Sequence, residues 1–450
     1  ALNTTGLFVD GSTGVPSRYL PPDRGEPIEY IVDVATLPAG MTQGQAMAAL
    51  TNSLNAWSAV TSLQFKFIGF ETFTQASPTI TIKDGRLRIQ LHDSFNYISN
   101  PSTLGIGGRN YAVSSAFPNG GMGGRVNAQE FYPNNFGYVV MNHRPTSMQN
   151  VKTYEEVLCH ELGHSLGLAH SSENPGEPNA VLKQAMMYFQ VHADNRGATL
   201  GSYDPPIVQK VHPQGNTPPY GYSRVMDIVT ASPQPNVAGV NSVGATGYDL
   251  QGDSLTTSLV SSSANNGSFA LVGGLLKYTA NFPVDAPNRF DPAGSQAWES
   301  AFLRFNDGVH ASPYVTVRVL SYHLDTRPAG ASDGIPDGWA QTNFGSITPS
   351  SAAKTRAQDD YDGDGLTNLE EWLAGTGPAT SNSRLQISTF DGSTLNFAAR
   401  PYEVYEVVGS TDFSTWTRSG TPVLPLTTTG TRDGLGASTG HKFFQVRRVP

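Results

Sequence analysis

Three histidines at fixed spacing are the residues of this chain best suited to chemistry. Residues 160–170 read His-Glu-Leu-Gly-His-Ser-Leu-Gly-Leu-Ala-His. His160 and His164 are four residues apart, so on a helix they share one face, one turn apart. Gly167 can adopt a positive φ, which allows the chain to leave the helix and bring His170 back as a third ligand. Three protein ligands leave one position of Zn²⁺ open to water, which is typical of a catalytic site.

Glu161 follows the first histidine and is suited to move a proton rather than to bind the metal. On a helix, the residue next to a ligand is rotated beside the metal, so its carboxylate can hold a water molecule there. Glu161 is therefore the predicted general base, which takes the proton of the attacking water and later delivers it to the leaving amine. The spacing thus predicts a zinc-dependent hydrolase that needs no nucleophilic side chain.

The residues around the motif predict a helix. Thr153 and Glu156 fit a capping box at its start. The only cysteine, Cys159, is interpreted as a small buried helix residue rather than a metal ligand. The apolar residues that can face a core while the histidines face a cleft are Val157, Leu158, Leu162 and Leu166.

The string at 160–170 resembles the signature of the metzincin zinc peptidases. The closest similarity is to the matrixin branch, because His-Ser stands at 170–171, a proline at 175 and Ala-Met-Met-Tyr at 185–188. The intervening stretch 173–184 is longer than the matrixin loop. The resemblance implies a secreted zinc endopeptidase that acts on a protein or peptide substrate. The zinc ligands that it implies are His160, His164 and His170.

The same resemblance implies a Met-turn, in which a methionine lies beneath the metal site and supports the ligands without binding zinc. Two methionines fit this role. Aligned with A-L-M-Y of the matrixins, Met187 is the Met-turn residue. Aligned with M-x-Y of the astacins and serralysins, Met186 is that residue, and Tyr188 becomes a candidate transition-state or cleft residue.

Residues 1–225 are predicted to form this metzincin-like zinc peptidase domain, with an α+β fold. Thr42 is expected to cap a helix that ends near Val60, and Asp204 to cap a short last helix. The domain is expected to contain strands at 29–34, 63–68, 79–83, 87–92, 125–131 and 137–141.

A glycine- and asparagine-rich stretch, 93–125, is expected to be a loop. The strand expected at 125–131 is the predicted site of substrate pairing. An extended peptide that pairs its backbone with an edge strand gains affinity with little sequence preference.

A second motif predicts a calcium site. Residues 360–371 fit D-x-D-x-D-G-x-x-N-x-x-E at every position. Ca²⁺ prefers six to eight oxygen ligands, and Gly365 permits the sharp turn that such a loop needs. With Asp333 and Asp337 upstream, the segment resembles the calcium repeats of dockerins and thrombospondin type-3 segments. The predicted ligands are Asp360, Asp362, Asp364, the carbonyl of Leu366, Asn368 and Glu371.

The remaining chain is expected to form β modules. Short alternating runs separated by turn signals at 226–328 resemble a cadherin-like or immunoglobulin-like sandwich, with the calcium-binding, EF-hand-like loop segment at 329–380 and a small C-terminal β module at 381–450. The predicted protein is thus multidomain. An alternative function is a calcium-stabilised extracellular adhesin or glycan-binding protein in which proteolysis is secondary. Its partner would be an extracellular-matrix or cell-surface polymer bound by the C-terminal modules.

The composition of the chain limits the classes of protein to which it can belong. The chain has 450 residues, a formal charge of −9, a single cysteine and no apolar run long enough to span a membrane. The negative charge disfavours nucleic acid as a partner, because phosphate binding needs basic patches. One cysteine excludes an intramolecular disulfide framework. Among the other histidines, only His192, close to the Met-turn, is singled out as a further candidate.

Overall fold

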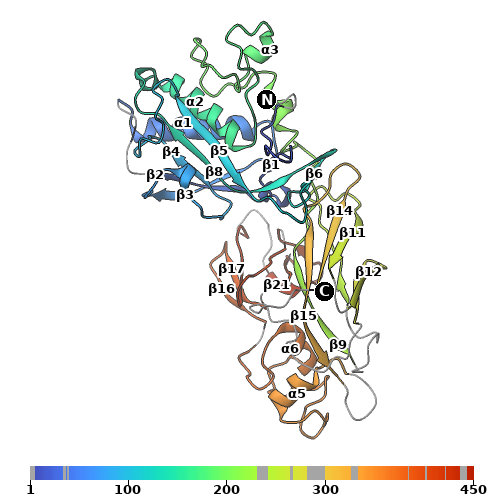
Figure 1. Cartoon of the computed structure of the whole chain (residues 1–450). Helices are drawn as coiled ribbons and strands as arrows, with labels where there is room; N and C mark the ends of the chain where they lie inside the picture. Colours follow the sequence, from blue (N-terminus) through green and yellow to red (C-terminus); the bar gives the residue numbers. More distant parts are fainter. Residues whose placement is uncertain are drawn as a thin grey trace. The chain divides into compact units, whose positions relative to one another are not determined.

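The computed structural model shows a multidomain protein with an α+β unit and a β-rich unit (Figure 1). The first compact unit comprises Ala1–Tyr220, Tyr248–Thr256 and Phe305–Tyr314. The second comprises Gly221–Gly247, Thr257–Arg304 and Val315–Pro450. Segments 248–256 and 305–314, predicted as part of the second module, thus pack with the first unit. The structure describes residues 6–33, 37, 40–230, 242–263, 267–280, 299–325, 333–383, 385–400, 403–420, 422–435 and 443–449.

A six-stranded sheet forms the framework of the first unit, in the order β1-β8-β4-β2-β3 with β5 paired to β8. All pairs along this order are parallel, and β5 runs antiparallel to β8. The site-bearing helix contacts β5 and β8. The strands are β1 (Ser17–Arg18), β2 (Ile28–Asp33), β3 (Phe65–Glu71), β4 (Leu87–Gln90), β5 (Gly105–Tyr111) and β8 (Tyr132–Met141).

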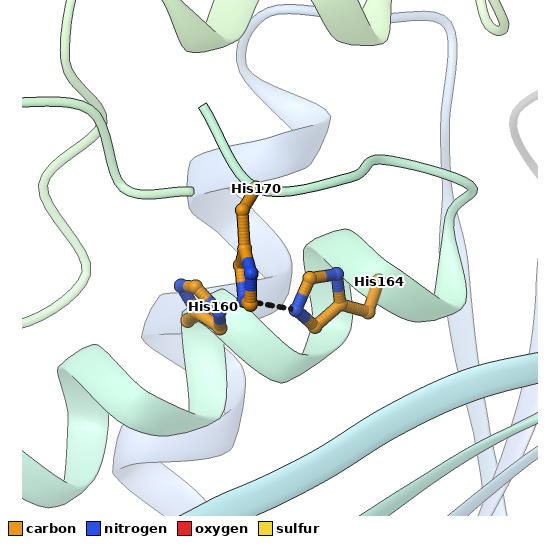
Figure 2. A group of neighbouring side chains, drawn as sticks. All are labelled: His160, His164 and His170. Atoms are coloured by element: carbon orange, nitrogen blue, oxygen red, sulfur yellow. Dashed lines mark hydrogen bonds between the residues drawn. The ribbon is translucent and has the colours of Figure 1, made fainter. Parts of the chain in front are cut away.

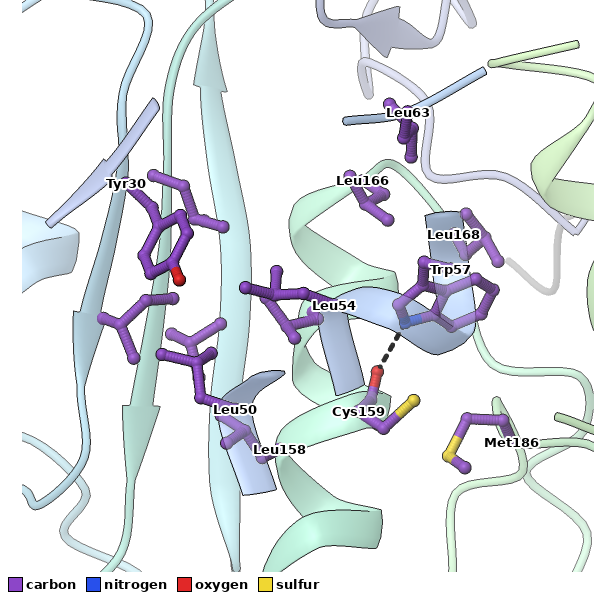
Figure 3. Packing of buried hydrophobic residues seen from close by; sticks show 14 of the residues in the cluster. Tyr30, Leu50, Leu54, Trp57, Leu63, Leu158, Cys159, Leu166, Leu168 and Met186 are labelled. Carbon is purple, nitrogen blue, oxygen red and sulfur yellow. Dashed lines mark hydrogen bonds between the residues drawn. The ribbon is translucent and has the colours of Figure 1, made fainter. Parts of the chain in front are cut away.

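Two long helices pack against each other beside this sheet. Helix α1 (Gln43–Ser58) starts with a capping box between Thr42 and Gln45, which confirms the predicted cap. Helix α2 (Val151–Ser165) carries the histidine motif. The buried Trp57 of α1 donates its indole N–H to the carbonyl of Cys159 at 3.0 Å, and both side chains lie in the core of this unit (Figure 3). Cys159 is therefore the buried helix residue that the sequence predicts.

Two predicted helix caps are wrong. Helix α2 begins after Asn150, whose side chain accepts hydrogen bonds from the backbone of Lys152 and Thr153, so Glu156 does not belong to a capping box. The N-cap of helix α4 (Asp204–Val208) is Tyr203. Asp204 is the first residue of the helix, and its carboxylate accepts a hydrogen bond from the backbone N–H of Met186. The shorter helices are η1 (Pro21–Arg24), η2 (Ser77–Thr79), η3 (Thr146–Gln149) and α3 (Ala180–Lys183).

Two strand predictions and one loop prediction also differ from the structure. No strand forms at 79–83, where the chain leaves the short helix η2. The stretch expected to be a loop contains β5, the antiparallel strand next to α2. The segment 125–131 forms a separate two-stranded ribbon of β6 (Arg125–Val126) and β7 (Gln129–Glu130) instead of one strand.

The second unit consists mainly of four small sheets, with orders β10-β13-β12, β11-β14-β15-β9, β16-β17-β20 and β19-β18-β21. Most pairs are antiparallel, as the alternating runs predict, but β9 pairs with β15 in parallel. None of the helices among the described residues combines the length and the hydrophobicity of a membrane span. The elements are β9 (Arg224–Thr230), β10 (Ser242–Gly244), β11 (Thr256–Ser263), β12 (Gly267–Val272), β13 (Leu275–Ala280), β14 (Ser300–Asn306), β15 (Val315–Leu324), α5 (Asp337–Phe344), α6 (Asn368–Ala374), β16 (Ile387–Phe390), β17 (Leu395–Ala398), β18 (Tyr405–Ser410), β19 (Thr417–Arg418), β20 (Thr429–Arg432) and β21 (Phe443–Arg448).

Candidate metal and catalytic site

The three histidines of the motif converge at the end of α2 (Figure 2). The helix ends at Ser165, and Gly167 has φ 109°, so the predicted glycine turn brings His170 back over the helix. One ring nitrogen of each histidine lies within 4.8 Å of the others. The turn is fixed in place by the N-terminal segment, because Phe8 donates its backbone N–H to the carbonyl of Gly167 at 2.9 Å.

Hydrogen bonds at the far side of each ring fix the histidine tautomers. His160 Nδ1 donates to the carbonyl of Met186 at 2.7 Å, and His164 Nδ1 donates to the carbonyl of Leu168 at 2.8 Å. His170 Nδ1 donates to Glu173 Oε1 at 3.2 Å. Because each Nδ1 carries the proton, each Nε2 keeps its lone pair. Partners of this kind are typical of metal-binding histidines.

The arrangement of these lone pairs fits a zinc ion. His164 Nε2 and His170 Nε2 are 3.1 Å apart, and both are acceptors, so they repel each other unless a cation lies between them. Tetrahedral ligands at the usual Zn–N distance are about 3.3 Å apart. Burial and the nearby His170 lower the pKa of His160 to about 4, and burial places the pKa of His164 well below its usual range. These two rings are therefore neutral at pH 7, as metal ligation requires.

Glu161 lies beside the histidines in a buried position. Burial raises the pKa of its carboxyl to about 8, and a backbone hydrogen bond from Gly107 opposes that shift. Strand β5 approaches α2 closely at this point. A Cβ atom at Gly105 would lie 2.7 Å from Glu161 Cγ, and one at Gly107 would overlap the carbonyl oxygen of Glu161. The glycines that suggested a loop are what permit this close strand–helix contact.

The two candidate methionines occupy different positions. Met187 is fully buried, and a side chain at Gly163, between the first two histidines, would collide with its Sδ atom. Met186 presents its carbonyl to His160 and lines the cavity in front of the site. Tyr188 also lines this cavity, and its hydroxyl donates to the carbonyl of Asn174 at 2.8 Å.

Asp204 is a supporting residue that sequence reasoning missed. Its Oδ2 accepts the backbone N–H of Met186 and of Gly201, each at 2.7 Å, and its Oδ1 accepts the N–H of Met187 at 3.1 Å. Burial raises the pKa of this carboxyl, and the three hydrogen bonds lower it, with burial the larger effect. Its position before two prolines resembles a helix cap, and no local signal indicates a partner 18 residues upstream.

A cavity of about 840 Å³ opens in front of the histidines and Glu161. One wall is formed by 102–107, which includes the start of β5, and another by Met186 and residues 188–191. None of the residues of 125–131, the predicted substrate strand, lines it. Glu156, mistaken for a capping residue, lies in the lining. The spacing could have revealed it, because Glu156 is four residues before His160 and shares its helix face.

The predicted calcium loop brings its acidic residues together. Carboxylate oxygens of Asp360, Asp362 and Asp364 lie within 4.8 Å of one another. The loop is shaped by backbone N–H groups: Gly365 donates to Asp360 Oδ2 at 2.9 Å, and Leu366 donates to Asp364 Oδ1 at 2.9 Å. Gly365 has φ 99°, consistent with the sharp turn that the motif requires.

Helix α6 adds two buried polar side chains at this loop. Asn368 donates its amide N–H groups to the carbonyls of Lys354 and Arg356, which leaves Oδ1 without a hydrogen-bond partner among the described residues. Glu371 is also fully buried, and its Oε2 has no hydrogen-bond partner among the residues that the structure describes. Burial and the negative charges of the loop, chiefly that of Asp362, raise the pKa of Glu371 to about 7.

Another acidic group, Asp249, Asp253 and Asp307, lies in the first unit. Asp249 Oδ1 accepts the backbone N–H of Gln251 and Asp253, as in an ordinary turn. Asp249 Oδ2 is buried and has no hydrogen-bond partner among the described residues.

The mixed sheet, the two packed helices and the three converging histidines define the first unit as a metzincin-like metallopeptidase domain. Residues 24–212 match the family model described as Matrixin, so this part of the chain is similar to the matrixin peptidases. The match covers less than half of the chain and ends before the second unit begins. None of the curated proteins matches the chain closely enough to count as a relative.

Proposed function

We propose that this chain is a secreted, zinc-dependent endopeptidase whose zinc ligands are His160, His164 and His170. The observation that carries the proposal is the orientation of the three rings, whose Nδ1 atoms are all bonded to acceptors while their Nε2 lone pairs converge. A Zn²⁺ ion held there supplies Lewis acidity, which polarises a carbonyl group and activates water for attack. Secretion is inferred from the matrixin match, because members of that family generally act outside the cell.

Glu161 is the proposed general base and acid. Its carboxyl lies within the cavity lining, next to the histidines, and its pKa of about 8 places it in the range where a carboxyl group can both accept and release a proton. The hydrogen bond from Gly107 holds the side chain in position for that transfer. We assign Met187 as the Met-turn residue, because it lies directly beneath α2 at Gly163. Tyr188 is assigned to the cleft wall.

Strand β5 is the proposed substrate-binding strand in place of 125–131. It is bonded to β8 on one side and borders the cavity at 105–107. An extended peptide added at its other edge would present its scissile bond to the histidines. Backbone pairing of this kind suits cleavage within a chain, because it does not require a chain end.

The decisive experiment compares Glu161→Ala with the wild type in a cleavage assay on a peptide library, with zinc measured in both proteins. The expected result is a loss of cleavage of at least 100-fold with zinc content retained, since Glu161 moves a proton and does not bind the metal. Glu155→Gln is a matched control, because Glu155 bonds Asn52 and Ala198 outside the cavity. Normal cleavage by Glu161→Ala would show that the assigned base is wrong.

We also propose that the loop at 360–371 binds Ca²⁺ through Asp360, Asp362, Asp364, the carbonyl of Leu366, Asn368 and Glu371. Support comes from the buried acceptor oxygens of Asn368 and Glu371, which have no hydrogen-bond partner among the described residues. Burying an unpaired acceptor costs free energy, and a bound Ca²⁺ ion would remove that cost. Calorimetric titration of the full chain with Ca²⁺ should show a site that Glu371→Gln weakens at least tenfold. Asp359→Asn, which removes an adjacent carboxylate paired to Arg356, should leave binding unchanged. Equal binding by all three proteins would exclude this loop as the site.

A further inference from the structure

Glu156 is the feature of the cavity that the proposed catalytic chemistry does not use. It lies one helical turn before His160 on the same face of α2 and lines the cavity beside the metal ligands. It is only 3% exposed, although a carboxylate is normally left in water. A buried acid in the lining of this cavity needs either a partner within the protein or one that arrives with a bound molecule.

Among the described residues, only one of its two carboxylate oxygens has a hydrogen-bond partner. Oε1 accepts the backbone N–H of His192 at 2.8 Å and contacts Nδ1 of the same ring at 2.6 Å. His192 Nε2 donates to the carbonyl of Lys183 at 2.7 Å, so this nitrogen carries a proton. His192 therefore holds Glu156 Oε1 rigidly in place, since both of its ring nitrogens are engaged.

The other oxygen, Glu156 Oε2, is buried and has no hydrogen-bond partner among the described residues. Whichever way the proton between Oε1 and His192 is shared, Oε2 keeps lone pairs and can only accept. Leaving such an acceptor unpaired is costly, and a donor that reaches it recovers that cost. Among the described residues that line the cavity there is no lysine or arginine, while Glu156 and Glu161 both line it.

We propose that Glu156 determines substrate specificity by selecting a basic residue next to the scissile bond. The inference rests on the proposed peptidase function. The aliphatic stem of a lysine or arginine side chain would pass the apolar wall provided by Val157 and Val191, and its charged end would donate to Oε2. His192 is a positioning residue, because it acts by fixing the carboxylate and does not touch the substrate.

The test uses the full chain and a peptide library randomised at the two residues that flank the scissile bond. Wild-type protein should enrich lysine and arginine at one of these two positions. In matched peptides, lysine should exceed norleucine, which is lysine without its ammonium group, by about 10-fold or more in kcat/KM, the effect expected of a hydrogen bond to a charged group. Equal cleavage of the two peptides would overturn the proposal.

The Glu156→Gln variant keeps the shape of the side chain but places an amide nitrogen where Oε2 stands. It should lose the preference for lysine while it still cleaves the norleucine peptide. Glu155→Gln, the same change one residue earlier outside the cavity, should keep the preference. If the zinc-loaded, folded Glu156→Gln protein still preferred lysine, a group other than Glu156 would be responsible for that preference. If that variant does not fold, the wild-type comparison still decides the question.

A second readout does not depend on turnover. Calorimetry with Glu161→Ala should show tighter binding of the lysine peptide than of the norleucine peptide, and equal binding would contradict the proposal. The two proposals fail separately: a protein that cleaves no peptide overturns the peptidase function, whereas one that cleaves without a basic preference overturns only the role of Glu156.

Discussion

Asp204→Asn is predicted to loosen the floor of the metal site although Asp204 does not contact the histidines. The wild-type carboxylate accepts three backbone N–H groups, two at Oδ2 and one at Oδ1. Asparagine has one acceptor oxygen, and its amide nitrogen cannot accept. In the better of its two orientations, asparagine therefore leaves the N–H of Met187 unpaired and facing another donor.

The magnitude follows from these three bonds. One unpaired buried donor costs about 1–3 kcal/mol, and each of the two remaining bonds loses about 1 kcal/mol when the acceptor is no longer charged. The neutral amide avoids the desolvation that raises the pKa of Asp204, which offsets part of the loss. The expected net destabilisation of this turn is about 2–4 kcal/mol.

Native-state hydrogen exchange is the suitable assay, because unfolding of a chain with two compact units is not a single transition. Peptides that contain the amides of Met186 and Met187 should exchange about 30- to 1000-fold faster in Asp204→Asn. Asp194→Asn is the control, since that carboxylate is half exposed and its pairing with Arg196 contributes little. Unchanged protection at Met186 and Met187 would refute the view that Asp204 holds the turn.

Three further predictions concern packing and charge. Gly107→Ala should destabilise the first unit by about 1–3 kcal/mol and slow cleavage, because the added methyl overlaps the carbonyl of Glu161; thermal unfolding and kcat measure this. Trp57→Phe should cost about 2 kcal/mol, because it removes the hydrogen bond to Cys159 and leaves a gap in the core, measurable by the same unfolding assay. Glu371 has its pKa raised to about 7, so it holds a proton below that pH, and Ca²⁺ affinity measured by calorimetry should fall about tenfold per pH unit below 7.

Each of these predictions has a clear contrary outcome. Gly11→Ala adds a methyl with no atom within 4 Å and should leave stability unchanged, so equal effects at Gly11 and Gly107 would contradict the packing argument. A Trp57→Phe protein as stable as the wild type would show that the indole bond contributes nothing. The raised pKa of Glu371 also means that its contribution to the stability of the calcium-free protein is lost as pH rises through about 7. A calcium affinity independent of pH between 5 and 8 would contradict the protonation of Glu371.

The sequence predicts the histidine cluster well because its information is local. A helix places His160 and His164 on one face whatever surrounds it, and Gly167 supplies a turn that no other residue makes as easily. The geometry of 360–371 is local in the same sense, since backbone N–H groups of the loop bond its own carboxylates. Such motifs do not depend on the rest of the fold for their shape.

The structural predictions are wrong where a residue that fits a local pattern instead contacts a residue far away in the sequence. Glu156 follows Thr153 at the spacing of a capping box, but Asn150 caps the helix, and Glu156 instead bonds His192, 36 residues away. The loop predicted where β5 lies is wrong for a related reason. Its glycines weaken any strand signal, but they are there because α2 passes too closely for side chains, which only the assembled fold reveals.

A single peptide unit explains how Asp204 can act on zinc from outside the cleft. The N–H of Met187 and the carbonyl of Met186 belong to the same peptide group: the N–H donates to Asp204 Oδ1, and the carbonyl accepts the proton of His160 Nδ1. A carboxylate at one end of this group polarises the peptide, so the carbonyl at the other end becomes a stronger acceptor. A stronger acceptor at Nδ1 makes Nε2 a better metal ligand and fixes the orientation of the ring. Asp204→Asn should therefore weaken zinc binding by about 10- to 100-fold, the range found when partners of metal ligands are removed. Competition with a zinc chelator would measure this, and wild-type affinity in the variant would show that the peptide group does not transmit the effect.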